Sequence, residues 1–475
     1  MEKYRAMPVQ AKAAVWFAVC SVITKCISMI TVPIFTRLMS TDQYGVYSVY
    51  NSWLQMVTVI ATLRLDYSVF NKGMSKYPKE RDAYTVSMQT FTTLVVAGLA
   101  FVYLPFADII NACTGLSTVV TLMMLLEIVF SSAISYWMTR RRYEYRYHTI
   151  ILVTLVISVG NALLGLAAVL LFNQKDVARI ASCVIVYCIV GAVIYIINIR
   201  RGGKLICWGY VKYALAFNLP LLPHYGAMYV IDSFDRIMIQ GMVGFSAAAI
   251  YSVACALGSA LKIVTNSIGN AIVPWMYDMM GSGKFKKLSK TTSLVILIPV
   301  IPVLLLVLVG PEVIWLFGGD AYSEASYVLA PIAEALVFSF CYIVLANMEF
   351  FFDENRFVMV VSLIASAANI ALNYVFIAVF GYLAAAYTTL ACYVFIAACH
   401  FFYVRSLFKR MEMEPPFSAA LFGAAGLALI ALGVCITLLY PYPVIRYVLF
   451  IAAMVVLFIK RNQLTAFLRK IKKKK

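Results

Sequence analysis

Long apolar blocks of about 18–25 residues recur along the chain, separated by short polar connectors. Each block is long enough to cross a hydrocarbon core about 30 Å thick as an α-helix. Backbone groups in lipid must find hydrogen-bond partners within their own segment, so the blocks are forced into helices. The composition agrees, with 63% hydrophobic residues, 13% charged residues and a mean hydropathy of +0.89. The sequence therefore predicts an all-α, polytopic membrane protein.

The blocks predict about fourteen transmembrane helices. We place them at residues 13–36, 45–70, 84–106, 117–138, 150–172, 180–198, 213–234, 245–268, 291–309, 326–350, 357–379, 382–403, 418–439 and 443–459. The longest outer connection is about 310–325, which is too short to fold as a separate domain. Whatever the protein does, we expect it to act inside or at the faces of the bilayer.

The basic residues test this scheme, because cytoplasmic loops carry an excess of Lys and Arg. With the N-terminus inside, most of the 39 Lys and Arg residues fall in predicted cytoplasmic segments, including the tail at 470–475. The predicted outer segments hold only Arg37, Lys175, Arg179, Arg236 and Arg446. The net charge of +18 thus indicates loops that face anionic membrane lipid, and not nucleic acid. We expect a bacterial plasma-membrane protein with both termini in the cytoplasm.

Motifs for enzyme chemistry are missing from the sequence. It contains no phosphate-cradling Gly-rich loop with a Lys, no Ser/His/Asp arrangement and no metal-ligand spacing, so we expect no enzyme activity and no cofactor. The first residues lack a cleavage site, and the helix from Val15 onward should be retained. Most of the 11 cysteines lie inside apolar blocks, where we expect them to pack in the core.

The second half of the chain weakly repeats the first. Residues 35–39 and 47–49 resemble 234–238 and 251–253, an offset near 200 residues. Six predicted helices separate the copies, and an even number gives both halves the same orientation, related by an axis along the membrane normal. We therefore expect an N-terminal lobe at 1–205, a C-terminal lobe at 206–410, and a last segment at 411–475 with helices 13 and 14 and the basic tail. Helices 1, 2, 7 and 8 would line a cleft between the lobes.

Two lysines lie deep within predicted spans, Lys25 in the first and Lys262 in the eighth. An ionisable residue at mid-bilayer costs about 2.5–3.5 kcal/mol on insertion scales, so it usually faces water or a partner. Both lysines are too deep to reach the interface easily. We interpret them as the binding groups of a basic cavity that holds an anionic head group such as a pyrophosphate.

Four further charged residues are candidates for substrate binding or translocation, each with a structural alternative. Arg64 and Asp66 lie toward the inner end of the second span, where they could instead form a local pair at the interface. Asp235 and Arg236 lie at the outer end of the seventh, where they could instead cap a loop.

Two buried carboxylates occupy corresponding positions of the repeat, Glu127 in the fourth span and Glu334 in the tenth. They are candidates for ion coupling, and an inter-helix hydrogen bond is the alternative. His224 and His400 are assigned to packing. Pro220 and Pro223 should break or bend the seventh helix, which suits a moving gate or a static kink.

Several of these segments resemble the bacterial polysaccharide flippases. The residues that carry the resemblance are 34–40 (IFTRLMS) with 44–48 (YGVYS), 219–224 (LPLLPH) with 232–236 (DSFDR), and 368–374 (ANIALNY) followed by Gly381 and 384–386. The sequence is thus similar, over nearly its whole length, to the lipid-linked oligosaccharide flippase family of the multidrug/oligosaccharidyl-lipid/polysaccharide exporter (MOP) superfamily.

The resemblance implies two six-helix lobes, alternating access and a polyprenyl-pyrophosphate-linked oligosaccharide as cargo. It also implies polysaccharide polymerase and assembly proteins as partners, and leaves coupling to H⁺ or Na⁺ open. Lys25 and Lys262 match positions where lipid-pyrophosphate flippases place cavity arginines. Lysine keeps the charge there and loses the bidentate geometry.

Other functions stay open at this point. Within the superfamily they are a peptidoglycan-precursor flippase and a multidrug or cation antiporter, whose cavity should favour acidic and aromatic residues over lysines. A membrane glycan polymerase would need a large outer loop with catalytic residues. A structural scaffold would leave Lys25 and Lys262 unexplained.

Overall fold

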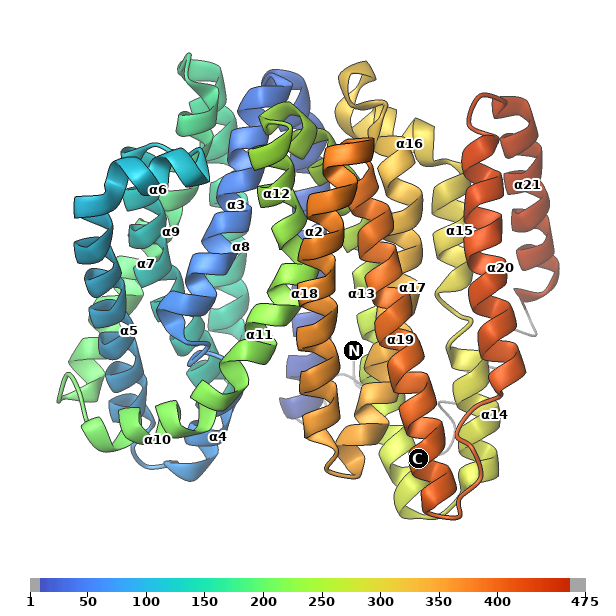
Figure 1. The fold of residues 1–475 in the computed structure, drawn as a ribbon. Helices are drawn as coiled ribbons and strands as arrows, with labels where there is room; N and C mark the ends of the chain where they lie inside the picture. The colour runs from blue at the N-terminus through green and yellow to red at the C-terminus, as the bar shows by residue number, and fades with distance from the viewer. Residues whose placement is uncertain (1–8, 462–475) are drawn as a thin grey trace, which may run out of the picture. The chain divides into compact units, whose positions relative to one another are not determined.

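The computed structural model describes residues 9–461, which form two compact units (Figure 1). The first unit comprises the described residues up to Ser252 together with Ser362–Ala385, and the second comprises Val253–Val361 together with the described residues from Ala386 onward. The chain passes between the units within α13 (Phe245–Gly281), within α18 (Asn355–Phe380) and near the start of α19 (Ala384–Arg410). The basic tail at 470–475 lies outside the described residues, and the lobe boundaries at 205 and 410 stay predictions.

The first unit is a bundle of antiparallel and broken helices. Besides parts of α13 and α18, its helices are α2 (Val9–Leu38), α3 (Thr41–Thr62), α4 (Ser68–Lys76), α5 (Arg81–Tyr103), η1 (Leu104–Phe106), α6 (Ala107–Thr114), α7 (Thr118–Tyr143), α8 (Tyr147–Leu171), α9 (Lys175–Gly202), α10 (Trp208–Asn218), η2 (Leu219–Leu221), α11 (Leu222–Tyr229), the π-helical turn η3 (Val230–Phe234) and α12 (Asp235–Met242). Helix α9 packs against α7 and α8, α2 packs on α8, and α5 packs on α7 (Figure 1).

The second unit is built around α17 (Ala325–Phe351), whose side chains are almost all buried. Its other helices, besides its parts of α13, α18 and α19, are α14 (Phe285–Val295), α15 (Val300–Leu308), α16 (Gly310–Gly318), η4 (Asp320–Tyr322), α20 (Ala419–Leu438) and α21 (Pro443–Ile459). Helix α20 packs on both α15 and α17, and α21 packs on α15 (Figure 1). A helix enclosed on all sides is expected to be mostly apolar, and α17 carries only Glu334 and Glu349 as charged residues.

The prediction of an all-α, multi-pass membrane protein is confirmed. Eleven helices in the described part of the chain are long and apolar enough to cross a membrane, and Pro443–Ile459 is a shorter apolar helix. Each of these coincides with one of the predicted spans. The predicted span 45–70 contains α3, which has 22 residues but is not apolar enough to be among the eleven, and the predicted span 213–234 is divided into short helices.

The prediction of one helix over 45–70 is wrong beyond Thr62. Leu63 and Arg64 both adopt left-handed backbone conformations, with φ of 47° and 52°, and so end α3 before α4 begins at Ser68. The break in the second span is compensated from another segment, since the Asn218 side-chain amide donates a hydrogen bond to the Leu63 carbonyl oxygen.

The predicted break in the seventh span is confirmed. Short helices replace the expected helix over 213–234, and Pro220 and Pro223 lie in the first turns of η2 and α11, where a missing backbone N–H is tolerated. The span predicted at 291–309 is also divided, with α14 and α15 separated before Pro299. The span predicted at 245–268 is longer than expected, as α13 continues to Gly281.

Among the cysteines expected in the core, Cys26 and Cys435 are exposed, whereas Cys20, Cys183, Cys341 and Cys392 are buried. The described cysteines are all free thiols.

Gly45 marks the closest approach of α3 to the start of α13. A Cβ atom built on Gly45 would lie 2.1 Å from the Phe245 carbonyl oxygen and 2.6 Å from its carbonyl carbon, and backbone atoms cannot rotate away.

We expect Gly45→Ala to destabilise the protein by about 1–3 kcal/mol, the usual cost of overpacking. The measurement is the apparent Tm of purified protein in detergent. Gly98→Ala is the matched control in another helix, since nothing lies within 4 Å of the Cβ built there. Equal melting of the two variants would contradict the packing role.

Glu312 in α16 anchors α21 through a bidentate ion pair. Arg446 Nη2 and Nη1 donate to Glu312 Oε1 and Oε2 at 2.7 and 2.8 Å. The hydrogen bonds from Arg446 lower the pKa of the Glu312 carboxyl below its usual value. A lowered pKa adds stability above the pKa of the unfolded chain, and that stability is lost as pH falls through the folded value.

We therefore expect Glu312→Gln to melt below the wild type near neutral pH, and the difference to shrink below about pH 4, where the carboxyl becomes protonated. Apparent Tm measured across that range tests this. A difference that is constant with pH would exclude the ionised pair as its source.

Candidate functional site

Lys25 lies in a polar stripe along α2. Ser21 and Ser28 stand four residues before and three residues after it, so all three side chains project from one side of the helix. All three are exposed in the isolated chain. An apolar helix that faced only lipid would not gather hydroxyl groups around a lysine near its middle.

Lys262 lies near the middle of α13, in a longer stripe of the same kind. Ser259, Asn266 and Asn270 are spaced three, four and eight residues from it, which again places them on its side of the helix. Lys262 is half-buried, and both asparagines are exposed.

The two stripes contain uncharged candidate residues that were not predicted from the charged residues of the sequence. Ser21, Ser28, Asn266 and Asn270 are neutral, yet their helical spacing relative to the lysines could have been read from the sequence. Hydroxyl and amide groups beside an ammonium group give donors and acceptors for phosphate oxygens and water. Lys25 belongs to the first unit and Lys262 to the second.

Arg64 lies between two aromatic rings and is not paired with Asp66. Its guanidinium carbon is 5.0 Å from the centroid of Tyr67 and 5.7 Å from that of Tyr225. The two rings meet edge to face at 5.8 Å, and the Tyr225 hydroxyl is 3.0 Å from the Ser68 hydroxyl. Tyr67 is 53% exposed. Aromatic faces beside a cation and hydroxyl groups could stack on and hydrogen-bond to a polar ring.

Asp66 is turned toward α7. Its Oδ2 accepts a hydrogen bond of 3.2 Å from the Ser135 hydroxyl, and its Oδ1 is buried with no hydrogen-bond partner in the described structure. The expected local Arg64–Asp66 pair is therefore not formed in the described structure. A carboxylate oxygen left without a partner is costly to bury, so this position can still accept a donor.

Asp235 begins α12 directly after the π-helical turn η3. It is buried, and accepts hydrogen bonds from the Tyr251 hydroxyl and, at 2.8 Å, from the backbone N–H of Arg236. π-Helical turns are rare and are frequent at functional sites. The contacts hold the carboxylate at a helix start, as in the capping alternative, and Arg236 is half-buried beside it.

Glu127 is buried at the meeting of α3 and α7. The Tyr50 hydroxyl donates to its Oε2 at 2.6 Å, so the predicted inter-helix hydrogen bond is present. Arg179 is close by, also buried, with Nη2 3.3 Å from the Tyr47 hydroxyl and its guanidinium 4.2 Å from the Phe35 ring centroid.

Glu334 is buried on α17 and faces α20 at a glycine. A Cβ on Gly433 would fall 1.4 Å from Glu334 Oε1, so the carboxyl group lies directly against the backbone of the other helix. A larger residue at position 433 would displace it.

His400, assigned to packing from the sequence, makes a direct polar contact. Its Nδ1 is 2.8 and 2.9 Å from the two carboxylate oxygens of Glu349, and both side chains have no exposed surface. Glu349 was not singled out from the sequence, because it lies near a span end where acidic residues are common. His224 fits packing better, with its ring 6.0 Å from that of Tyr225.

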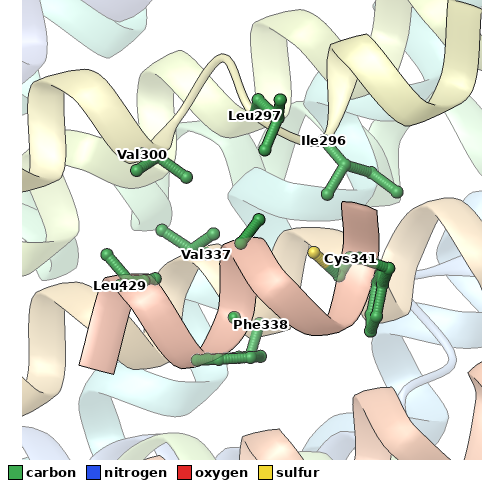
Figure 2. A pocket seen from close by; sticks show the side chains of 10 residues that line it. Ile296, Leu297, Val300, Val337, Phe338, Cys341 and Leu429 are labelled. Carbon is green, nitrogen blue, oxygen red and sulfur yellow. The ribbon is translucent and has the colours of Figure 1, made fainter. Parts of the chain in front are cut away.

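A pocket in the second unit has a different character. Its lining comes from residues 296–300, α17 and α20, and the side chains labelled in Figure 2 are hydrocarbon apart from the Cys341 thiol. It contains no charged group and no hydroxyl. The pocket suits hydrocarbon, and it cannot be the site of an anionic head group.

Within the described residues, no cluster of three or more His, Cys, Asp or Glu side chains could hold a metal ion.

Comparisons with known proteins identify the family of the chain. Residues 11–280 match the family model described as polysaccharide biosynthesis protein, which is more than half of the chain. The chain is similar to the Lsg locus putative protein 1 of Haemophilus influenzae, with 20% identity over 370 residues that cover 76% of this chain and 89% of that protein.

Two solved structures share the fold. The lipid II flippase MurJ in an inward closed conformation aligns with a TM-score of 0.67 and 12% identity, over 95% of this chain and 100% of that chain. A MATE family multidrug resistance transporter of the MOP superfamily, in an inward-facing conformation, aligns with a TM-score of 0.59 and 12% identity, over 81% of this chain and 99% of that chain. The chain therefore belongs to the polysaccharide biosynthesis protein family, and it shares its fold with these two structures.

Proposed function

We propose that the protein flips a polyprenyl-pyrophosphate-linked oligosaccharide from the inner to the outer leaflet of a bacterial plasma membrane, by alternating access. The observation that carries the proposal is the pair of polar stripes, each centred on a lysine in the middle of an apolar helix. Family membership supports a role in surface polysaccharide synthesis. Polysaccharide polymerase and assembly proteins would then be its partners.

The chemistry of the cargo explains what the chain must supply. A glycan head group cannot cross hydrocarbon unaided, because each unpaired hydroxyl costs several kcal/mol. A hydrated passage removes most of that cost while the lipid tail stays in the bilayer. Outward movement of an anion is helped by an inside-negative potential, by about 2.3 kcal/mol per charge per 100 mV.

In this proposal Lys25 and Lys262 bind the pyrophosphate in the inward-open state. Their ammonium groups attract phosphate oxygens, and the neighbouring hydroxyl and amide groups keep the passage wet. Arg64 and Asp66, with Tyr67 and Tyr225, contact the first sugars. Asp235 and Arg236 act at the outer end, and the broken segment α10–α12 serves as the gate. With α3, this segment and α21, the chain would complete fourteen spans with both termini cytoplasmic.

Loss of either deep lysine should weaken binding of the cargo. We expect Lys25→Ala and Lys262→Ala to reduce glycan export about tenfold or more, because hydrogen bonds to charged groups contribute about 1.5–3 kcal/mol each. Lys25→Arg and Lys262→Arg keep the charge and should retain most activity. The measurement is surface glycan in a deletion strain carrying each variant at equal membrane abundance.

Lys79→Ala is the matched control, since Lys79 is exposed in a connection between helices. Full export by both alanine variants would overturn the pyrophosphate-binding role. If the chain instead rescued cells depleted of their lipid II flippase, or exported cationic dyes, the cargo would be a peptidoglycan precursor or a drug.

Glu127 and Glu334 are our candidates for ion coupling in the two units. Glutamine preserves size and hydrogen bonding and removes the ionisable group, so we expect Glu127→Gln and Glu334→Gln to lower export severalfold with unchanged protein stability. Export and apparent Tm of the same preparations test this. A loss of activity that follows a loss of stability would leave only the inter-helix hydrogen bond of Glu127 as its role.

A further inference from the structure

Glu349 and His400 form a buried acid–imidazole pair in the second unit, far from both polar stripes in sequence. Glu349 lies near the end of α17, and His400 is on α19. Neither side chain has exposed surface, and Nδ1 of His400 lies 2.8 and 2.9 Å from the two oxygens of Glu349. A charge-assisted hydrogen bond thus joins the two helices.

The pair has a vacant position for a proton. With Nδ1–H donating to the carboxylate, the neutral imidazole leaves its second nitrogen as an acceptor, and His400 Nε2 is buried without a hydrogen-bond partner in the described structure. In that state the pair carries one uncompensated negative charge. The charged groups that act on the Glu349 carboxylate are His400 itself and Glu354, which adds further negative charge.

The surroundings of the pair disfavour that charge. The rings of Tyr342 and Phe357 lie 4.9 and 5.4 Å from the His400 ring. Met348, next to Glu349 in the sequence, and Phe401, next to His400, belong to a buried apolar cluster. Uptake of one proton gives either imidazolium with carboxylate or imidazole with carboxylic acid. Both forms are neutral overall, so binding a proton removes the cost of burying a net charge.

A second polar pair lies close in sequence to the first, beyond Glu349 and beyond His400. One turn beyond His400, the Tyr403 hydroxyl donates to Glu354 Oε2 at 2.7 Å, and the backbone N–H of Glu354 donates to the Glu349 carbonyl oxygen at 3.0 Å. Tyr403 and Glu354 are half-buried, and the exposed Arg410 lies 5.7 Å from the Tyr403 ring. The charge pattern predicts that this end faces the cytoplasm.

We propose that Glu349 and His400 are a proton-binding site, which takes up one proton from the cytoplasmic side and releases it during the transport cycle. The coupling to transport rests on the proposed function, whereas proton binding by the pair does not. This site is separate from Glu127 and Glu334, which have no such imidazole partner.

Proton binding can be observed directly, since the chain has only three histidines. His148→Gln and His224→Gln together leave His400 as the sole imidazole, provided that the affinity tag contains no histidine. In ¹⁵N-histidine NMR of this protein in nanodiscs, we expect the ring-nitrogen shifts of His400 to change as pH falls from about 9 to about 5. Glu349→Gln should displace that titration. Ring shifts that stay constant across the range in folded protein would overturn the proposal.

Coupling needs a second measurement, in proteoliposomes loaded with lipid-linked oligosaccharide extracted from a deletion strain. We expect an imposed pH gradient to accelerate flipping severalfold in the wild type and in the His148→Gln control, and not in His400→Gln or Glu349→Gln. Equal acceleration in all four proteins would overturn the coupling. Absence of any flipping by the wild type would reject the proposed cargo, while the NMR titration would still decide the proton site.

Discussion

The rest of the structure depends on one constraint, that a backbone placed in hydrocarbon must satisfy its own hydrogen bonds. Every place where this chain departs from continuous helix therefore has to be supported from elsewhere. The end of α3 at Leu63 is supported by the Asn218 amide, and the Tyr229 hydroxyl donates to the carbonyl oxygen of Ser52 within α3. The interrupted segment from α10 to α12 thus donates hydrogen bonds to the backbone of the other interrupted span.

The absence of water in hydrocarbon also limits where charged side chains can lie. In a chain with 13% charged residues, an ion in an apolar helix is retained only if it gains an interaction that offsets its desolvation. Three solutions are present. Arg446 forms a bidentate pair with a carboxylate, Glu127 accepts from a phenol hydroxyl, and Lys25 stands among hydroxyls on an exposed stripe. The first two fix helices together, whereas in our proposal the third binds the cargo.

Much of the fold could be predicted because the apolar blocks are long and uniform. The sequence did not reveal the break at Leu63 and Arg64, since neither residue is a helix breaker and the left-handed turn depends on contacts from α10. Pro220 and Pro223 were visible, and the break they predicted is present. The two lysines of the proposed site could be identified from the sequence by their charge. The pairing of Glu349 with His400 could not, because the two residues are 51 positions apart and meet only when their helices pack together.

The units are joined within helices. The chain passes from one unit to the other inside α13 at 252–253, inside α18 at 361–362 and inside α19 at 385–386, where the backbone is helical. A loop at such a joint would bend freely, whereas a helix resists bending and twisting. Any change of shape between the units must therefore bend or twist these three helices.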